Sequence, residues 1–246
     1  MAKKKDTIVE EQVIKEIRKS LGLPPRSASP HNDKKVIKEA YVTQAKKFNL
    51  STEFLSQKTK HARQKEFESY IEGLNSIAAQ LEAANREDAD KYSSEFRNLK
   101  VSEVHCLNAS FLRALHFENI SDPQSQLAMD SITFMRLERD FGNFDEWQKD
   151  FIACGMASRS GYVVTGYNSF LNRYMNYVID EESKNVPVGM HPVIVLDTSE
   201  GAYYRDYLDD RKTYIIAMMK ELDWDHINTR FKRAERMAKI TGEVKN

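Results

Sequence analysis

The sequence has few cysteines and no long apolar run, and both absences argue against whole classes of protein. Its two cysteines, Cys106 and Cys154, lie far apart and form no CxxC pair. That spacing argues against a disulfide framework or a zinc knuckle and is typical of a reducing compartment. No apolar run approaches the roughly 20 residues that a membrane-spanning helix needs, and the first residues lack the apolar stretch of a signal peptide. We therefore expect a protein that works, without a membrane, in the compartment where it is made.

The chain also lacks an excess of charge of either sign. The chain carries 37 basic and 37 acidic side chains, so its formal charge is +0. No global field would attract a nucleic acid, although a local basic patch could still do so. The sequence has no Gly-rich phosphate loop, nucleophile elbow or HxxxH spacing. What it does contain is apolar material, because 41% hydrophobic residues suffice for one sizeable core or two small ones.

Apolar residues recur at helical spacing in the first half of the chain. They predict a short amphipathic helix over Val9–Leu21, which is either a docked appendage or a helix that binds a partner. Leu23–Pro30 contains three prolines and is interpreted as a linker. Further helices are predicted over Asn32–Phe48, over about Ser51–Tyr92 and over about Val101–Asn119.

The second half mixes helices with strands. Tyr162–Asp180 is rich in Tyr and Val, alternates apolar and polar residues and predicts a β-hairpin with its turn at Gly166–Ser169. His191–Asp197 predicts a third strand. Four helices are expected around these strands, at Asp122–Asp140, Phe144–Ser158, Ala202–Leu222 and Asp225–Ile240.

One segment of the chain, His191–Phe231, carries a dense pattern at fixed spacing. Its members are Asp197, Glu200, Ala202, Tyr203, Tyr204, Asp206, Tyr207, Arg211, Tyr214, Ile215, Trp224 and Asp225. This pattern resembles the C-terminal signature of iron/manganese superoxide dismutases. Three upstream segments resemble that family more weakly: Phe141–Val164, Leu112–Ile120 and Lys47–Asn75. The resemblance extends over roughly Phe48 to Arg233.

The resemblance implies an α+β fold. It consists of an N-terminal helical hairpin domain and a C-terminal α/β domain with a three-stranded antiparallel sheet, preceded by an extra N-terminal helix and linker. The expected boundaries are residues 1–31 for the helix and linker, 32–121 for the hairpin domain and 122–246 for the α/β domain with its C-terminal helical extension.

The family holds one redox metal with three imidazoles and one carboxylate. Transferred residue by residue, the carboxylate is Asp197, and the imidazole positions fall on Gly201, Arg113 and Ala62, with His61 one residue out of register. Glycine has no side chain to donate, and a guanidinium has no lone pair for a cation. The resemblance therefore implies a degenerate site without metal, cofactor or catalytic residues, in a chain that is not an enzyme.

Three side chains are expected to make interactions at this degenerate site. Arg113 is predicted to form an ion pair with Asp197, since a buried carboxylate needs a charged partner. Glu200 and Tyr204 match positions through which the family's dimers bridge, although the ligand histidine that Glu200 would meet is missing. Tyr70 matches the tyrosine that guards the family's substrate funnel, and we expect it simply to be packed.

Three functions follow from the resemblance. The first is a structural or adaptor protein of a large assembly, such as a phage virion. The second is a dismutase-like protein of the mitochondrial ribosomal small subunit, and the third is an active dismutase. The ribosomal alternative predicts a basic chain with a presequence, whereas this one is neutral and acidic near its start. We therefore expect a cytoplasmic or virion protein whose partners are protein subunits and a second copy of itself. Nucleic acid is less favoured, although Arg230–Lys239 is a basic stretch on the last predicted helix.

Overall fold

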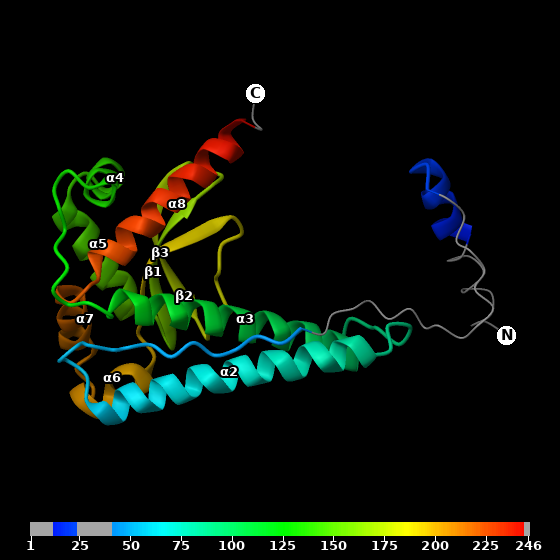
Figure 1. Cartoon of the computed structure of the whole chain (residues 1–246), viewed down its shortest axis with the longest axis horizontal. Helices are drawn as coiled ribbons and strands as arrows, with labels where there is room; N and C mark the ends of the chain where they lie inside the picture. The colour runs from blue at the N-terminus through cyan, green and yellow to red at the C-terminus, as the bar shows by residue number, and fades with distance from the viewer. Residues whose placement is uncertain (1–11, 24–40, 244–246) are drawn as a thin grey trace. The chain divides into compact units, whose positions relative to one another are not determined.

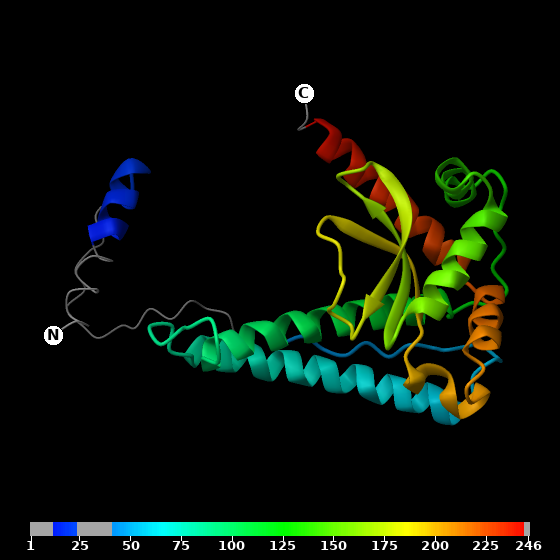
Figure 2. The same ribbon diagram turned by 180° about the vertical axis from the view of Figure 1, so that it is seen from behind.

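The computed structural model describes residues 12–23 and 41–243, which fall into two separate compact units (Figures 1 and 2). The first unit contains a helix over residues 12–20, which confirms the predicted amphipathic helix over that range. The predicted linker lies outside the described residues apart from Leu23. No helix among the described residues combines the length and apolarity needed to cross a membrane.

Two long antiparallel helices, α2 (Gln57–Ala83) and α3 (Glu95–Asn119), form a hairpin in the second unit (Figure 1). Each begins at a serine cap: Ser56 accepts a hydrogen bond from the backbone N–H of Thr59, and Ser94 accepts one from that of Arg97. Because Ser94 caps α3, that helix begins six residues earlier than the sequence pattern suggests.

The segment before α2 is not helical, so the helix predicted over Asn32–Phe48 is wrong for its described part, residues 41–48. Thr43 instead exchanges two hydrogen bonds with the side chain of Asn75, at 2.8 and 2.9 Å. The ring of Phe48 lies 5.5 Å from that of Phe67 and 5.2 Å from that of Phe117. These contacts hold the segment along the hairpin, so tertiary packing overrides the local helical periodicity. Residues 32–40 lie outside the described part.

The three predicted strands are confirmed as an antiparallel sheet in the order β2-β1-β3. The strands are β1 (Gly161–Asn168), β2 (Arg173–Asp180) and β3 (Met190–Asp197). The hairpin turn, however, lies at residues 169–172 and not at Gly166–Ser169. The side chain of Asn168 accepts hydrogen bonds from the backbone N–H groups of Phe170 and Leu171, and Asn172 takes a φ of 55°, so these residues close the turn.

The remaining helices are α4 (Ile132–Phe141), α5 (Phe144–Ala157), α6 (Glu200–Tyr207), α7 (Arg211–Lys220) and α8 (Trp224–Glu243). The single helix predicted over Ala202–Leu222 is therefore divided into α6 and α7. Leu208 adopts a φ of 53°, which an α-helix cannot contain, and Asp210 caps α7 by accepting from the backbone N–H of Thr213.

The sheet is buried on both faces, and alternate residues of β1 point to opposite sides. Tyr162 and Val164 pack with α3, whereas Val163 belongs to the main core with residues of α5, α7 and α8. Trp147 of α5 is fully buried in that core, and its indole N–H donates to the Thr165 hydroxyl at 2.9 Å. The rigid sheet thereby fixes Asp197, the last residue of β3, between the hairpin and the core.

We predict that Trp147→Ala lowers the free energy of unfolding by about 3–5 kcal/mol, because it leaves a large cavity in the core. Denaturant unfolding measures the change. Val188→Ala is the control, since Val188 is 99% exposed and its truncation should change stability by less than about 0.5 kcal/mol. Equal losses for the two variants would contradict this location of the core.

Candidate functional site

Asp197 is the centre of the candidate site. Its side chain is completely buried at the end of β3. Ser199 donates to the carboxylate from its backbone N–H at 3.0 Å and from its hydroxyl at 2.6 Å. The hydroxyl of Tyr214, in α7, donates to the backbone carbonyl of Asp197 at 2.7 Å. The strand end is therefore held in place by contacts from the following turn and from α7.

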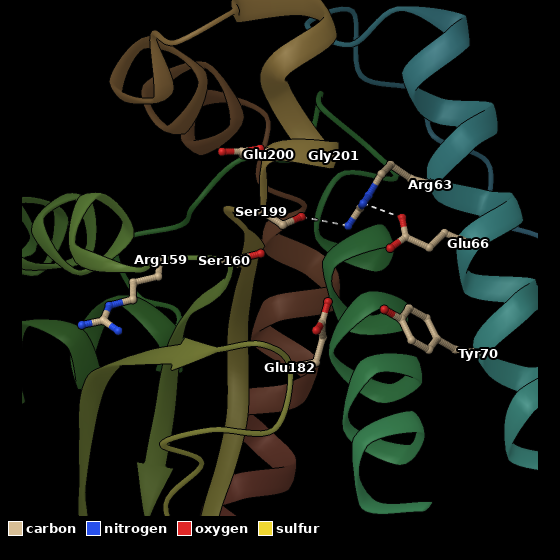
Figure 3. Close-up of a pocket in the computed structure, with 9 residues that line it drawn as sticks. All are labelled: Arg63, Glu66, Tyr70, Arg159, Ser160, Glu182, Ser199, Glu200 and Gly201. Atoms are coloured by element: carbon tan, nitrogen blue, oxygen red, sulfur yellow. Dashed lines mark hydrogen bonds and ion pairs between the residues drawn. The ribbon is translucent and has the colours of Figure 1, made fainter. Parts of the chain in front are cut away.

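Arg63 reaches Asp197 from α2 and is the carboxylate's nearest cation. Its Nη2 donates to Asp197 Oδ2 and, at 3.1 Å, to the hydroxyl of Ser199. Its Nη1 donates to Glu66 Oε2 at 2.5 Å (Figure 3). The side chain of Arg63 is only 6% exposed, so this guanidinium forms a buried ion pair with Asp197.

The sequence transfer placed Ala62 at this position, and the structure places Arg63 there instead. Ala62 is half-buried, and His61 is exposed. The missed signal is the buried stripe of α2, in which Thr59, Arg63 and Phe67 recur every four residues. An arginine on that stripe must point into the protein.

Arg113 of α3 supplies a second buried cation. The expected ion pair with Asp197 is present, with 3.7 Å between Nη2 and Oδ2. Arg113 also lies 3.2 Å from a carboxylate oxygen of Glu66 and 3.6 Å from one of Glu182. Its guanidinium stacks over the ring of Tyr70 at 5.1 Å. Two arginines and three carboxylates thus form one ion cluster, which we call the Asp197 cluster.

Gly201 lies directly against the guanidinium of Arg63. A Cβ atom at position 201 would lie 2.5 Å from Nη1 of Arg63. At that distance a side chain at 201 would force the Arg63 guanidinium to shift from its present position. The space left by the absent side chain at Gly201 is therefore filled by the Arg63 guanidinium.

The electrostatics of the Asp197 cluster keep the central carboxylate charged. Burial alone would raise the pKa of Asp197, but Arg63 and Arg113 lower it to about 2.

His116, whose Nδ1 lies 3.5 Å from the backbone N of Asp197, is also buried. Burial and, to a smaller extent, the two arginines lower the pKa of His116 against the opposing effect of Asp197, and the net value is about 4. His116 is therefore neutral at physiological pH.

An open pocket of about 550 Å³ lies beside the cluster. Figure 3 shows Arg63 and Glu66 on its α2 side and Tyr70 and Glu182 close to one another. Glu182 lies in the β2–β3 loop, where it has a φ of 56°. This pocket is lined by both acids and bases, and Tyr70, which we expected simply to be packed, is one of its walls.

Glu200 and Tyr204 lie on the surface of α6. Tyr204 is 55% exposed, and both residues line a second, smaller pocket together with Gly201 and Arg205. Both side chains are therefore accessible to a partner. Within the described part of the chain, no cluster of three or more His, Cys, Asp or Glu side chains is arranged to hold a metal ion.

Comparison with known proteins relates this chain to a family of enzymes. The family model for the C-terminal domain of iron/manganese superoxide dismutases matches residues 131–230. An iron superoxide dismutase of Aquifex pyrophilus is 32% identical over 171 residues, covering 68% of this chain and 79% of the relative. A manganese superoxide dismutase of Halobacterium salinarum is 31% identical over 166 residues, covering 65% and 78%. These relatives are all named as enzymes, so the prediction that the chain is not an enzyme is wrong.

The contact between Gly201 and Arg63 can be tested by a double-mutant cycle. We expect Gly201→Ala to destabilise the protein by about 1–3 kcal/mol, as overpacking does. In an Arg63→Ala background the same change should become neutral or stabilising by up to about 1 kcal/mol, because alanine is the better helix former. Denaturant unfolding of the four proteins measures the coupling, and strictly additive effects would contradict it.

The lowered pKa of His116 predicts a pH-dependent stability. The folded-state pKa is about 4, below the usual 6.5 or so of an unfolded histidine, so protonation favours the unfolded chain. The contribution of neutral His116 is complete above pH 6.5 and is lost as the pH falls towards 4, amounting to about 3 kcal/mol. In His116→Asn, the denaturant concentration at the unfolding midpoint should depend less on pH between these two values than in the wild type. His61→Asn, at an exposed position, should leave the wild-type profile unchanged.

Proposed function

Because the chain belongs to the iron/manganese superoxide dismutase family, we propose that it serves as a structural or adaptor subunit of a larger assembly, in which the Asp197 cluster joins the helical hairpin to the sheet. The observation that carries the proposal is the pair of buried guanidiniums, Arg63 and Arg113, that face Asp197. They belong to the chain itself and make the cluster independent of any added cation.

The donor set supports the proposal because it does not fit an iron or manganese ion. Three imidazoles and a carboxylate form the site that the family resemblance implies, and here the carboxylate faces two permanent cations. A guanidinium cannot ligate a metal ion and repels it. Asp197 would have to give up its hydrogen bond with Arg63 before it could bind the ion. Position 201 has no side chain to act as a ligand, and the Arg63 guanidinium fills the space beside it.

The cluster also supports a stabilising role. A fully buried carboxylate without a partner would be destabilising by several kcal/mol. Arg63 and Arg113 provide that partner from α2 and α3, and Asp197 ends β3. One set of ion pairs therefore joins the helical hairpin to the sheet and preserves the fold whose outer surfaces would serve the assembly.

The assembly that we propose first is a virus particle, with protein subunits and a second copy of the chain as partners. The exposed Glu200 and Tyr204 on α6 support contact with a second copy, since neither is used inside the chain's core. A ribosomal small subunit is the second candidate. Chemical cross-linking with mass spectrometry in the native particle separates them, because the cross-linked neighbours would be virion proteins in one case and ribosomal proteins in the other.

The metal content of the purified protein tests the proposal. Protein produced with excess iron and manganese should contain well below one metal ion per chain, and a chelator should leave its thermal unfolding midpoint unchanged. A variant that combines Arg63→His, Arg113→His and Gly201→His is the matched comparison, because it places three imidazoles beside Asp197. One iron or manganese ion per wild-type chain, which the chelator removes with a drop in the thermal unfolding midpoint, would overturn the proposal.

A further inference from the structure

The outer face of α8 carries a row of basic side chains that the proposed function does not use. The exposed members are Lys232, Arg233, Arg236 and Lys239. Successive residues of a helix are rotated by about 100°, so Lys232, Arg236 and Lys239 lie on one face and Arg233 beside it. The row from 232 to 239 is about 10 Å long at 1.5 Å per residue. We call these four residues the α8 basic row.

Arg230 does not belong to this row, although the sequence pattern includes it. Its guanidinium is buried and donates to the carbonyl oxygens of Val193 and Leu115, and it is 3.0 Å from the carboxylate of Glu118. Arg230 therefore joins α8 to α3 and β3. Of the basic stretch that the sequence predicts over Arg230–Lys239, only positions 232–239 contribute basic side chains to the surface.

The acidic side chains beside the row are already paired. Glu235 is the one acidic residue between positions 229 and 240 of the sequence. It accepts two hydrogen bonds from Arg136 of α4, at 2.8 and 2.9 Å, and one from Tyr174. Asp140, at the end of α4, is bonded in the same way by Arg139 at 2.7 Å. Glu235 and Asp140 are thus engaged by Arg136 and Arg139, which lie outside the α8 basic row.

The apolar face of α8 is committed to the core. Ile227, Phe231 and Ala234 are buried there. A helix that lies on a membrane surface needs a broad apolar face to enter the lipid, and in α8 this face is occupied. Only Met237 and Ile240 are apolar and exposed on the described outer side near the row. The available chemistry of this surface is therefore positive charge.

We propose that the α8 basic row binds the phosphate backbone of a nucleic acid. In a strand whose phosphates advance by about 3.4 Å each, a row of about 10 Å covers roughly three phosphates. Nothing in the row distinguishes bases, so the contact is independent of sequence. Such a row can attract phosphates although the net charge of the chain is +0. At physiological salt, charges more than about 8 Å away are largely screened, so only the charges close to the contact contribute.

Fluorescence anisotropy of the full-length chain with labelled short DNA and RNA duplexes tests the proposal. Three phosphate contacts predict a slope of about −2.7 in the plot of log affinity against log salt, which weakens binding about 40-fold between 50 and 200 mM salt. Replacing all four residues of the row by Gln should abolish most of this binding and flatten the slope. Because the variant keeps the Asp197 cluster, its metal content should not change.

The matched control removes the same charge from other helices, through Lys58→Gln and Lys65→Gln on α2 with Lys212→Gln and Lys220→Gln on α7. These lysines are exposed, and the control should retain wild-type affinity and slope. Equal losses in the two quadruple variants would overturn the proposal, since they would indicate general charge attraction. Absence of binding at 50 mM salt, or tighter binding to anionic lipid vesicles or to polyglutamate than to the duplexes, would also overturn it.

Discussion

The complete burial of the Asp197 carboxylate is the constraint on which the rest of the site depends. A charge in this position is tolerated only beside a cation, and the chain supplies two of them from α2 and α3. The second arginine in turn requires Glu66, Glu182 and the ring of Tyr70 as neighbours. The polar interior between the hairpin and the sheet is therefore one coupled network, arranged around a single carboxylate.

Much of the fold could be predicted from the sequence because its signals are local. The strands follow from alternation, and the hairpin helices follow from their apolar spacing. Two features could not be predicted this way. Residues 41–48 have helical periodicity but are held extended by Asn75, Phe67 and Phe117, which are distant in sequence. The break between α6 and α7 depends on the backbone of Leu208, and leucine gives no sign of a positive φ.

The sequence predicted the ion pair between α3 and β3, but it placed the contributing residue of α2 one position too early. Arg113 lies within ion-pair distance of Asp197, as predicted from the family resemblance and from the need of a buried carboxylate for a cation. The transfer placed Ala62 one residue before Arg63, because it did not consider which face of α2 is buried. The relatives' names establish the family, whereas the chemistry of this chain depends on its own side chains at those few positions.

The contact of Arg63 with Gly201 makes the two positions dependent on each other. With Arg63 in its present position, a Cβ atom at 201 would lie 2.5 Å from Nη1, so a side chain there would require the guanidinium to shift. Glycine at 201 therefore allows Arg63 to reach Asp197 without such a shift. Once both are present, restoring a larger residue at 201 alone is penalised by the steric overlap, and removing Arg63 alone takes away the nearest cation of a buried carboxylate. Positions 63 and 201 are therefore coupled, so the effect of a substitution at either one depends on the residue present at the other.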